Sequence, residues 1–172
     1  MVDTIMTLKM CLPNEIRLKD VVEVFQDYKK SALLLCCVSC DWKCCREAGI
    51  SNEVCQNHSI SSQREVTIPF DSVLNKVSRS FTDAIIFGGL EPLLQIEEVC
   101  GLIEYLREHN VKKDILIYTG YYLEEIDKSI IERLKKHHVI LKCGRYIPNR
   151  PQKFDKILGI TLASDNQYGV QL

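Results

Sequence analysis

The chain has 172 residues, of which 46% are hydrophobic and 26% are charged, and its formal net charge is −1. This length and composition predict one globular domain over residues 1–172, and the lack of surplus basic residues argues against nucleic acid as a partner. The longest apolar run, residues 32–38, is far shorter than the roughly 20 residues that cross a bilayer, and the N-terminus lacks the pattern of a signal peptide. We therefore expect a cytoplasmic protein that has no membrane contact.

Residues 1–30 give no clear pattern, because apolar residues at helical spacing overlap others that alternate as in a strand. Residues 32–38 are predicted to form a buried strand, and a cysteine-rich loop, called the cysteine loop below, follows over residues 39–62. Asp71 is expected to cap a helix that reaches Ser80, since its carboxylate can accept the free amide hydrogens of a first helical turn.

The second half of the chain alternates strands and helices in a regular way. Its expected elements are a short buried strand at 84–87, an amphipathic helix at 95–108, a strand at 114–118, an amphipathic helix at 123–136, and strands at 139–143 and 157–162. This alternation, with short turns, predicts parallel βα units. In such sheets ligands bind beyond the carboxyl ends of the strands. The unusual sequences of this chain lie there: the cysteine loop, GGLEP and TGYY.

The cysteines are unusual in number and position. The chain has nine, and six of them lie within a stretch of twenty residues. In a reducing cytosol such crowding favours metal ligation over disulfides. Cys36 and Cys37 suit a buried apolar strand, because free cysteines behave as small hydrophobes. Cys40, Cys44 and Cys55 lie among polar residues, so we predict that they ligate a metal; three thiolates can hold three irons of a [4Fe–4S] cluster and leave the fourth open to a small molecule.

The cysteine loop resembles the cluster loop of radical S-adenosylmethionine enzymes. Cys40 and Cys44 keep that family's C-x3-C spacing, and Asn57 follows Cys55 where the small activating enzymes of the family often place an asparagine. The loop also departs from the family, whose third cysteine usually comes three positions after the second and follows an aromatic residue. Here that aromatic residue is missing, and Cys45 competes with Cys55 as the third ligand, so both alternatives stay open.

A second motif, FGGLEP, ends the strand expected at 84–87. Its two glycines let the backbone approach a ligand closely, because neither carries a β-carbon. The motif resembles the Gly-Gly-Glu/Asp-Pro segment that binds the amino group of S-adenosylmethionine in the radical enzymes. Gly88, Gly89 and Glu91 match it, with Leu90 as a one-residue insertion. The resemblance therefore implies that these three matching residues bind the cofactor.

Further matches follow in the same order along the chain. DILIYTGYYLEEI, residues 114–126, is similar to a strand-turn-helix segment with a Thr-Gly-Tyr core in the activating proteins of anaerobic ribonucleotide reductases. CGRY and LASDNQ resemble that family's Asp-Gly-Lys/Arg-Phe and Gly-Ser-Ser-Asn-Gln segments, although Cys143 stands where Asp is usual. Those segments line the cofactor pocket in the family, so the resemblance, which spans residues 32–167, implies four more cofactor contacts. These are Thr119, Gly120, Ser164 and Asn166.

The resemblance also implies a fold and a reaction. The fold is a partial (β/α)6 barrel that is open on one side. The reaction is the reductive cleavage of S-adenosylmethionine by the [4Fe–4S] cluster to a 5′-deoxyadenosyl radical, with no catalytic side chain beyond the cluster ligands. In activating enzymes this radical takes a hydrogen from a backbone glycine of a glycyl radical enzyme, here expected to be the anaerobic ribonucleotide reductase. A flavodoxin or ferredoxin would supply the electron.

Two other interpretations stay open. One is a radical enzyme of the same type that acts on another peptide or on a small molecule. The other is a non-catalytic module with a closed Cys3His zinc site, because Cys40, Cys44, Cys55 and His58 spell C-x3-C-x10-C-x2-H. The zinc interpretation leaves GGLEP and TGYY without a role.

Overall fold

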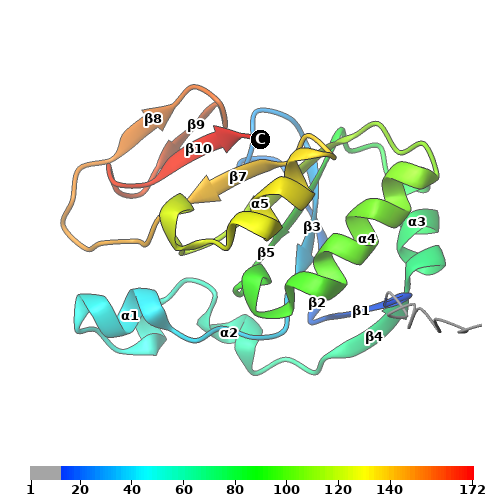
Figure 1. Ribbon diagram of the computed structural model, residues 1–172. Coiled ribbons are helices and arrows are strands. Elements are labelled where there is room, and N and C mark those ends of the chain that lie inside the picture. The colour runs from blue at the N-terminus through cyan, green and yellow to red at the C-terminus, as the bar shows by residue number, and fades with distance from the viewer. Residues whose placement is uncertain (1–12) are drawn as a thin grey trace, which may run out of the picture.

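A mixed six-stranded sheet forms the centre of the computed structural model, which describes residues 13–172 (Figure 1). In sheet order its strands are β10 (Tyr168–Gln171), β7 (Ile140–Cys143), β6 (Asp114–Tyr118), β5 (Ala84–Gly88), β3 (Ala32–Cys36) and β2 (Asp20–Val24). The four middle strands run parallel, and each edge strand pairs antiparallel with its neighbour. The prediction of parallel βα units is therefore confirmed for the strands expected at 32–38, 84–87, 114–118 and 139–143.

The middle strands are apolar along almost their whole length because both faces of the sheet are covered. In β5 all five residues are buried. Successive side chains of a strand point to opposite faces. Leu33, Ile85 and Ile115 accordingly belong to one core cluster, whereas Ile86 and Leu116 belong to another on the opposite face.

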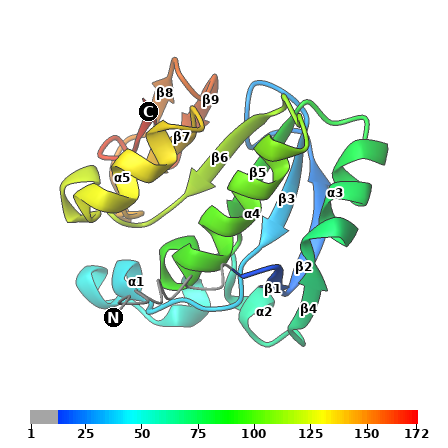
Figure 2. The ribbon, with the colours of Figure 1, turned by 45° about the vertical axis from the view of Figure 1, so that its right-hand side comes forward.

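Three helices cover one face of the sheet (Figure 2). They are α3 (Phe70–Arg79), α4 (Ile96–Glu108) and α5 (Lys128–Lys135), and the short 3-10 helices η2 (Pro92–Gln95) and η3 (Leu123–Glu125) precede α4 and α5. In α4 the side chains of Val99, Leu102, Ile103 and Leu106 are fully buried in the larger core cluster. The helical spacing of these apolar residues predicts such a buried face.

A smaller core cluster lies on the opposite face, beside β8 (Lys153–Asp155) and β9 (Ile160–Leu162). These two strands pair antiparallel with each other as a separate sheet. Leu158 and Leu162 share the cluster with Ile86 and Leu116 of the main sheet. The amide of Lys29 donates to the carbonyl of Leu158 at 2.9 Å, so the segment before β3 holds this two-stranded unit in place.

The cysteine loop lies between β3 and β4 and contains three short helices. These are α1 (Lys43–Ala48), η1 (Asn52–Val54) and α2 (His58–Ser61). Figure 1 places α1 at the end of the sheet toward which β7 points. After the loop, β4 (Val66–Pro69) pairs antiparallel with β1 (Glu15–Leu18) in a further two-stranded sheet. No helix within the described part of the chain is long and apolar enough to cross a membrane.

Two expected helix starts are corrected by the structure. The N-cap of α3 is Pro69, and Asp71 lies in the first turn instead of capping it. The helix expected over 123–136 is interrupted and begins only at Lys128, because the carboxylate of Asp127 accepts an amide hydrogen of the first turn and caps it there.

The N-terminal part without a clear pattern forms β1 and β2 from position 15 onward, and its first twelve residues lie outside the described residues.

The expected strand at 157–162 is also corrected. Only its last three residues are extended, and they pair with β8 rather than joining the parallel sheet. The carboxylate of Asp155 accepts the amides of Ile157 and Leu158, both at 2.9 Å, which turns the chain there. The last strand of the main sheet is instead β10, an antiparallel edge strand. The fold is α/β with an open mixed sheet, and its description as a partial (β/α)6 barrel stays a proposal.

Candidate functional site

The loops that follow β3 and β5 are tied together by backbone hydrogen bonds. The amide of Cys37, after β3, donates to the carbonyl of Gly88 at the end of β5 at 2.8 Å. The amide of Glu91 donates in the other direction, to the carbonyl of Ser39, also at 2.8 Å. The cysteine loop and GGLEP therefore lie side by side at the carboxyl edge of the sheet, where parallel βα units place ligand sites.

Glu91 joins GGLEP to the loop that follows β6. Its side chain is buried and accepts hydrogen bonds from the hydroxyl of Thr119 at 2.8 Å and from the amides of Gly120 at 2.9 Å and Leu93 at 3.1 Å. Burial raises the pKa of this carboxyl, and the three hydrogen bonds act in the opposite direction. Both carboxylate oxygens are thus engaged by the protein. Glu91 holds the two loops together, and its contact with a cofactor stays a prediction.

The glycines of the predicted cofactor site pack against β3 or the cysteine loop. A β-carbon on Gly120 would lie 2.7 Å from the sulfur of Cys44, closer than real β-carbons come to another atom. Gly89 has a φ of +73°, and a β-carbon there would lie 3.1 Å from the β-carbon of Cys36. Gly88 is also tight, at 3.3 Å from a side chain of β3. These positions favour glycine because neighbouring segments of the protein approach so closely.

Cys40 lies three residues before α1, and Cys44 is in its first turn. The sulfur of Cys40 accepts a hydrogen bond from the amide of Trp42 at 3.3 Å, and the left-handed backbone of Trp42 (φ 57°) begins the helix that carries Cys44. Both thiols are partly exposed. Burial raises the pKa of Cys40 to about 12 and also raises that of Cys44, where the Tyr146 amide and the Arg145 charge act in the opposite direction. Both groups are therefore neutral thiols near pH 7 and would lose their protons on binding a metal.

The third predicted ligand lies apart from these two. Cys55 ends η1 and is partly exposed, and Cys45 on α1 is buried. Burial raises the pKa of Cys45, and the nearby Cys55 adds to that effect. Within the described part of the chain no group of three or more His, Cys, Asp or Glu side chains is arranged to hold a metal ion. The structure thus brings Cys44 to Gly120 without gathering three cysteines, and the identity of the third ligand stays a prediction.

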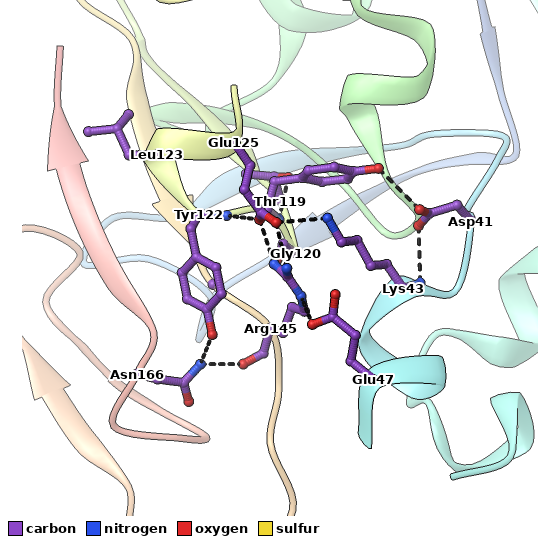
Figure 3. Close-up of polar contacts among 12 residues, drawn as sticks. Asp41, Lys43, Glu47, Thr119, Gly120, Tyr122, Leu123, Glu125, Arg145 and Asn166 are labelled. Atoms are coloured by element: carbon purple, nitrogen blue, oxygen red, sulfur yellow. Dashed lines mark hydrogen bonds and ion pairs between the residues drawn. The ribbon is translucent and has the colours of Figure 1, made fainter. Parts of the chain in front are cut away.

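A cluster of charged residues that no sequence motif indicates joins three segments at this edge (Figure 3). This Arg145 cluster consists of Lys43 and Glu47 from α1, Glu125 from η3, and Arg145 after β7. Arg145 donates to both carboxylate oxygens of Glu125 at 2.6 Å and also to Glu47, and Lys43 donates to Glu125 at 2.7 Å. The hydrogen bonds from Arg145 lower the pKa of Glu125 to about 2. No sequence pattern pairs Glu47 with Arg145, because 98 positions separate them.

The LASDNQ segment packs on the same stretch of backbone. The side-chain amide of Asn166 donates to the carbonyl of Arg145 at 2.8 Å and to the hydroxyl of Tyr122 at 3.0 Å (Figure 3). The hydroxyl of Ser164, which is fully buried, donates to the same carbonyl at 3.4 Å. The Oδ1 atom of Asn166 is buried and has no hydrogen-bond partner among the described residues. An unsatisfied acceptor of this kind fits a donor group of a bound molecule.

Lys142 is a further residue at this edge that no sequence motif indicates. It lies in β7 opposite Tyr118, and its ammonium is 5.7 Å from the centroid of the Tyr118 ring. No ion pair between described residues includes it. Burial lowers the pKa of its side chain, and the nearby Cys44, Cys143 and Glu91 act in the opposite direction. The available signal was one charged residue inside the apolar run VILKC, in which the neighbouring residues are buried and Lys142 itself is half-buried.

Comparison with known proteins places the chain in a family. The family described as a 4Fe–4S single cluster domain matches residues 32–167, so the chain belongs to the family of 4Fe–4S single cluster domains. The anaerobic ribonucleoside-triphosphate reductase-activating protein of Enterobacteria phage T4 is 32% identical to it over 93 residues, which are 53% of this chain and 54% of the relative. The chain thus spans about half the length of the curated relative that it matches. Both findings confirm the resemblance seen in the motifs, and no solved structure matches the chain.

Proposed function

We propose that the chain binds a [4Fe–4S] cluster through Cys40, Cys44 and Cys55 and uses it to cleave S-adenosylmethionine reductively. The observation that carries this proposal is the match to the 4Fe–4S single cluster family, which covers residues 32–167 and so includes all three cysteines. When bound, such a cluster supplies one electron to the sulfonium, which yields methionine and a 5′-deoxyadenosyl radical. Cys45 is the alternative to Cys55 as the third ligand.

The residues at the carboxyl edge fit these two groups. Cys40 and Cys44 offer the sulfur donors that iron–sulfur clusters require. S-adenosylmethionine carries an amino group and a carboxylate on its amino-acid portion. The unpartnered Oδ1 atom of Asn166 fits a donor such as the amino group, and the ammonium of Lys142, which lies in no ion pair of the described residues, fits the carboxylate. The apolar face of the sheet beside β8 and β9 borders this edge and would keep water away from the site.

The other predicted cofactor residues form the surrounding wall in this proposal: Gly88, Gly89, Glu91, Thr119, Gly120 and Ser164. Glu91 and Ser164 are buried and bonded to the protein, so we assign them the task of holding the loops in place. Gly89 and Gly120 would bind the cofactor only through their backbone groups, because Cys36 and Cys44 take up the space of their missing β-carbons. We propose that the open mixed sheet is a partial (β/α)6 barrel whose open side admits a substrate.

The phage relative supports a particular substrate. It is a reductase-activating protein, and we infer that this chain likewise activates a glycyl radical enzyme, an anaerobic ribonucleotide reductase, by removing a hydrogen atom from a backbone glycine. The radical acceptor would close the open side of the sheet. A flavodoxin or ferredoxin is the proposed electron donor.

The reaction is tested with anaerobically purified protein, dithionite and S-adenosylmethionine. We expect release of 5′-deoxyadenosine and, when the reductase is added, a glycine-centred radical that gives a doublet in the EPR spectrum. Cys44→Ala should lose both signals, whereas Cys100→Ala, in the buried face of α4, should keep both. Cleavage of S-adenosylmethionine without a glycyl radical would favour a radical enzyme that acts on another peptide or on a small molecule.

One observation favours the zinc alternative. The Nδ1 atom of His58 is buried without a hydrogen-bond partner among the described residues, and its ring lies 5.8 Å from the ring of Trp42 in the same loop. With Cys40, Cys44 and Cys55 this histidine would complete a closed Cys3His site. A colourless protein that carries one tightly bound zinc per chain and does not cleave S-adenosylmethionine would support that module over the radical enzyme.

A further inference from the structure

We propose that Arg145 is a positioning residue that locks the cysteine loop against the strand ends and thereby fixes Cys44 beside Gly120. The inference rests on the proposed function only for the role of Cys44 as a metal ligand. The lock itself follows from contacts among described residues, which Figure 3 shows.

The first half of the lock lies on α1. Lys43 and Glu47 are four residues apart, so they share one face of this helix, and Cys44 lies between them in the sequence. Lys43 donates to Glu125 at 2.7 Å, and Glu47 accepts from Arg145. Two charged contacts therefore connect the helical turn that carries Cys44 to the segments after β6 and β7.

The second half of the lock lies on the backbone against which Cys44 packs. A guanidinium nitrogen of Arg145 donates to the carbonyl of Gly120 at 3.1 Å, and the approach of the Cys44 sulfur leaves no room for a β-carbon at that glycine. The guanidinium carbon also lies 4.6 Å from the centroid of the Tyr122 ring. Arg145 thus binds both the helix that carries Cys44 and the turn beside it, so the loss of either contact would let the sulfur move.

Burial makes the contacts of Arg145 depend on one another. Its side chain is only 7% exposed, whereas Glu47 is 49% exposed. A guanidinium that lost its acidic partners would be left buried and unpaired, which is strongly unfavourable. All three of its nitrogens donate to protein groups. Arg145 is therefore not free to bind a carboxylate or phosphate of a ligand, although the CGRY segment resembles one that lines the cofactor pocket in related proteins.

The test measures how fast iodoacetamide alkylates Cys44 in the metal-free protein, with mass spectrometry to resolve each cysteine. The sulfur of Cys44 is partly exposed and packs against Gly120, so loss of that contact makes it more accessible and raises its rate. The rates are compared per thiolate, from the pH dependence of each rate, because the Arg145 charge also lowers the pKa of Cys44. Arg145→Gln is expected to raise the Cys44 rate per thiolate about tenfold or more, which corresponds to ~1.4 kcal/mol or more in the free energy of exposing the sulfur. The rate of buried Cys100 should not change. Glu47→Gln, at the more exposed acid, should raise the Cys44 rate less.

Arg133 provides a matched control for this experiment. It also bridges two acids, Glu97 at 2.8 Å and Glu104 at 2.5 Å, but its contacts join α5 to α4. Arg133→Gln should lower the thermal unfolding midpoint as Arg145→Gln does, and yet leave the alkylation rate of Cys44 at its wild-type value.

An unchanged Cys44 rate in Arg145→Gln, or an equal rise in Arg133→Gln, would overturn the lock. If Arg145→Gln does not fold, the Glu47→Gln variant alone tests the lock. The absence of a rise in the Cys44 rate of that variant then overturns the lock. The readout needs no metal. A chain that never binds iron but shows the selective rise at Cys44 would refute the proposed function and support the lock. A chain that binds iron but shows no such rise would support the proposed function and refute the lock.

Discussion

The sulfur of Cys44 packs so close to Gly120 that no residue with a β-carbon fits at position 120. A β-carbon there would come within 2.7 Å of the Cys44 sulfur. The amide of Gly120 is held in turn by Glu91 at 2.9 Å, so the turn cannot simply move away. At the scale of single residues, one missing side chain therefore decides where a proposed cluster ligand lies.

The variant Gly120→Ala should displace Cys44, because the added methyl group has no space. We expect the free energy of unfolding to fall by about 1–3 kcal/mol, as for other overpacked positions, and the iron bound after reconstitution to fall as well. Gly49→Ala is the control: its φ of +65° also strains a side chain, but a β-carbon there meets nothing within 4 Å. It should lose stability and keep its iron. Wild-type iron content in Gly120→Ala would contradict this account.

A second prediction at the scale of single residues concerns Lys142. Burial lowers the pKa of its side chain, so the folded state disfavours the charged form. Lys142→Met removes that charge and is expected to raise the free energy of unfolding of the metal-free protein at pH 7 by about 1 kcal/mol in urea titrations. Lys112→Met, at an exposed position, should change it by no more than about 0.5 kcal/mol. A loss of stability in Lys142→Met would show that the ammonium has a favourable partner.

At the scale of elements, the sequence predicts the four parallel strands well because each is an apolar run covered on both faces. Strand β10 escapes prediction, since its four residues YGVQ include a glycine and no fully buried side chain. Helix α5 starts late because the Asp127 cap competes with the continuing apolar pattern. Local polar groups such as Asp127 and Asp155 thus set boundaries that hydrophobic spacing alone does not show.

The contact between α1 and η3 should depend on pH. Hydrogen bonds from Arg145 are the main reason why the pKa of Glu125 lies at about 2 rather than at its ordinary value of 4.5. A carboxyl whose pKa is lowered by folding contributes stability that is fully present above pH 4.5 and is lost as the pH falls toward 2. Urea unfolding of the metal-free protein over this range should therefore show a shallower decline for Glu125→Gln than for the wild type.

The matched control for the pH experiment is Glu132→Gln, on the exposed side of α5. It should keep the wild-type decline of the unfolding free energy between pH 4.5 and pH 2, the range set by Glu125. If Glu125→Gln declines as steeply as this control, Arg145 does not stabilise the charged carboxylate in the way that the structure indicates.

At the scale of the whole molecule, motifs from separate parts of the chain meet at one edge of the sheet. Parallel topology explains why the sequence could place the cysteine loop, GGLEP and TGYY together. It could not show that both carboxylate oxygens of Glu91 accept hydrogen bonds, or that Lys142 faces this edge, because both depend on tertiary packing. The Arg145 cluster lay beyond reach for the same reason, since its members come from three distant segments.

The central claim is that Cys40, Cys44 and Cys55 hold a [4Fe–4S] cluster, and the most direct measurement is iron and sulfide per chain after anaerobic reconstitution. The account predicts about four of each, lost in the alanine variant of each of these three cysteines and kept in Cys37→Ala, whose thiol is buried in the core. Loss in Cys45→Ala with retention in Cys55→Ala would move the third ligand to Cys45. A protein that binds zinc but no iron and sulfide would contradict the account.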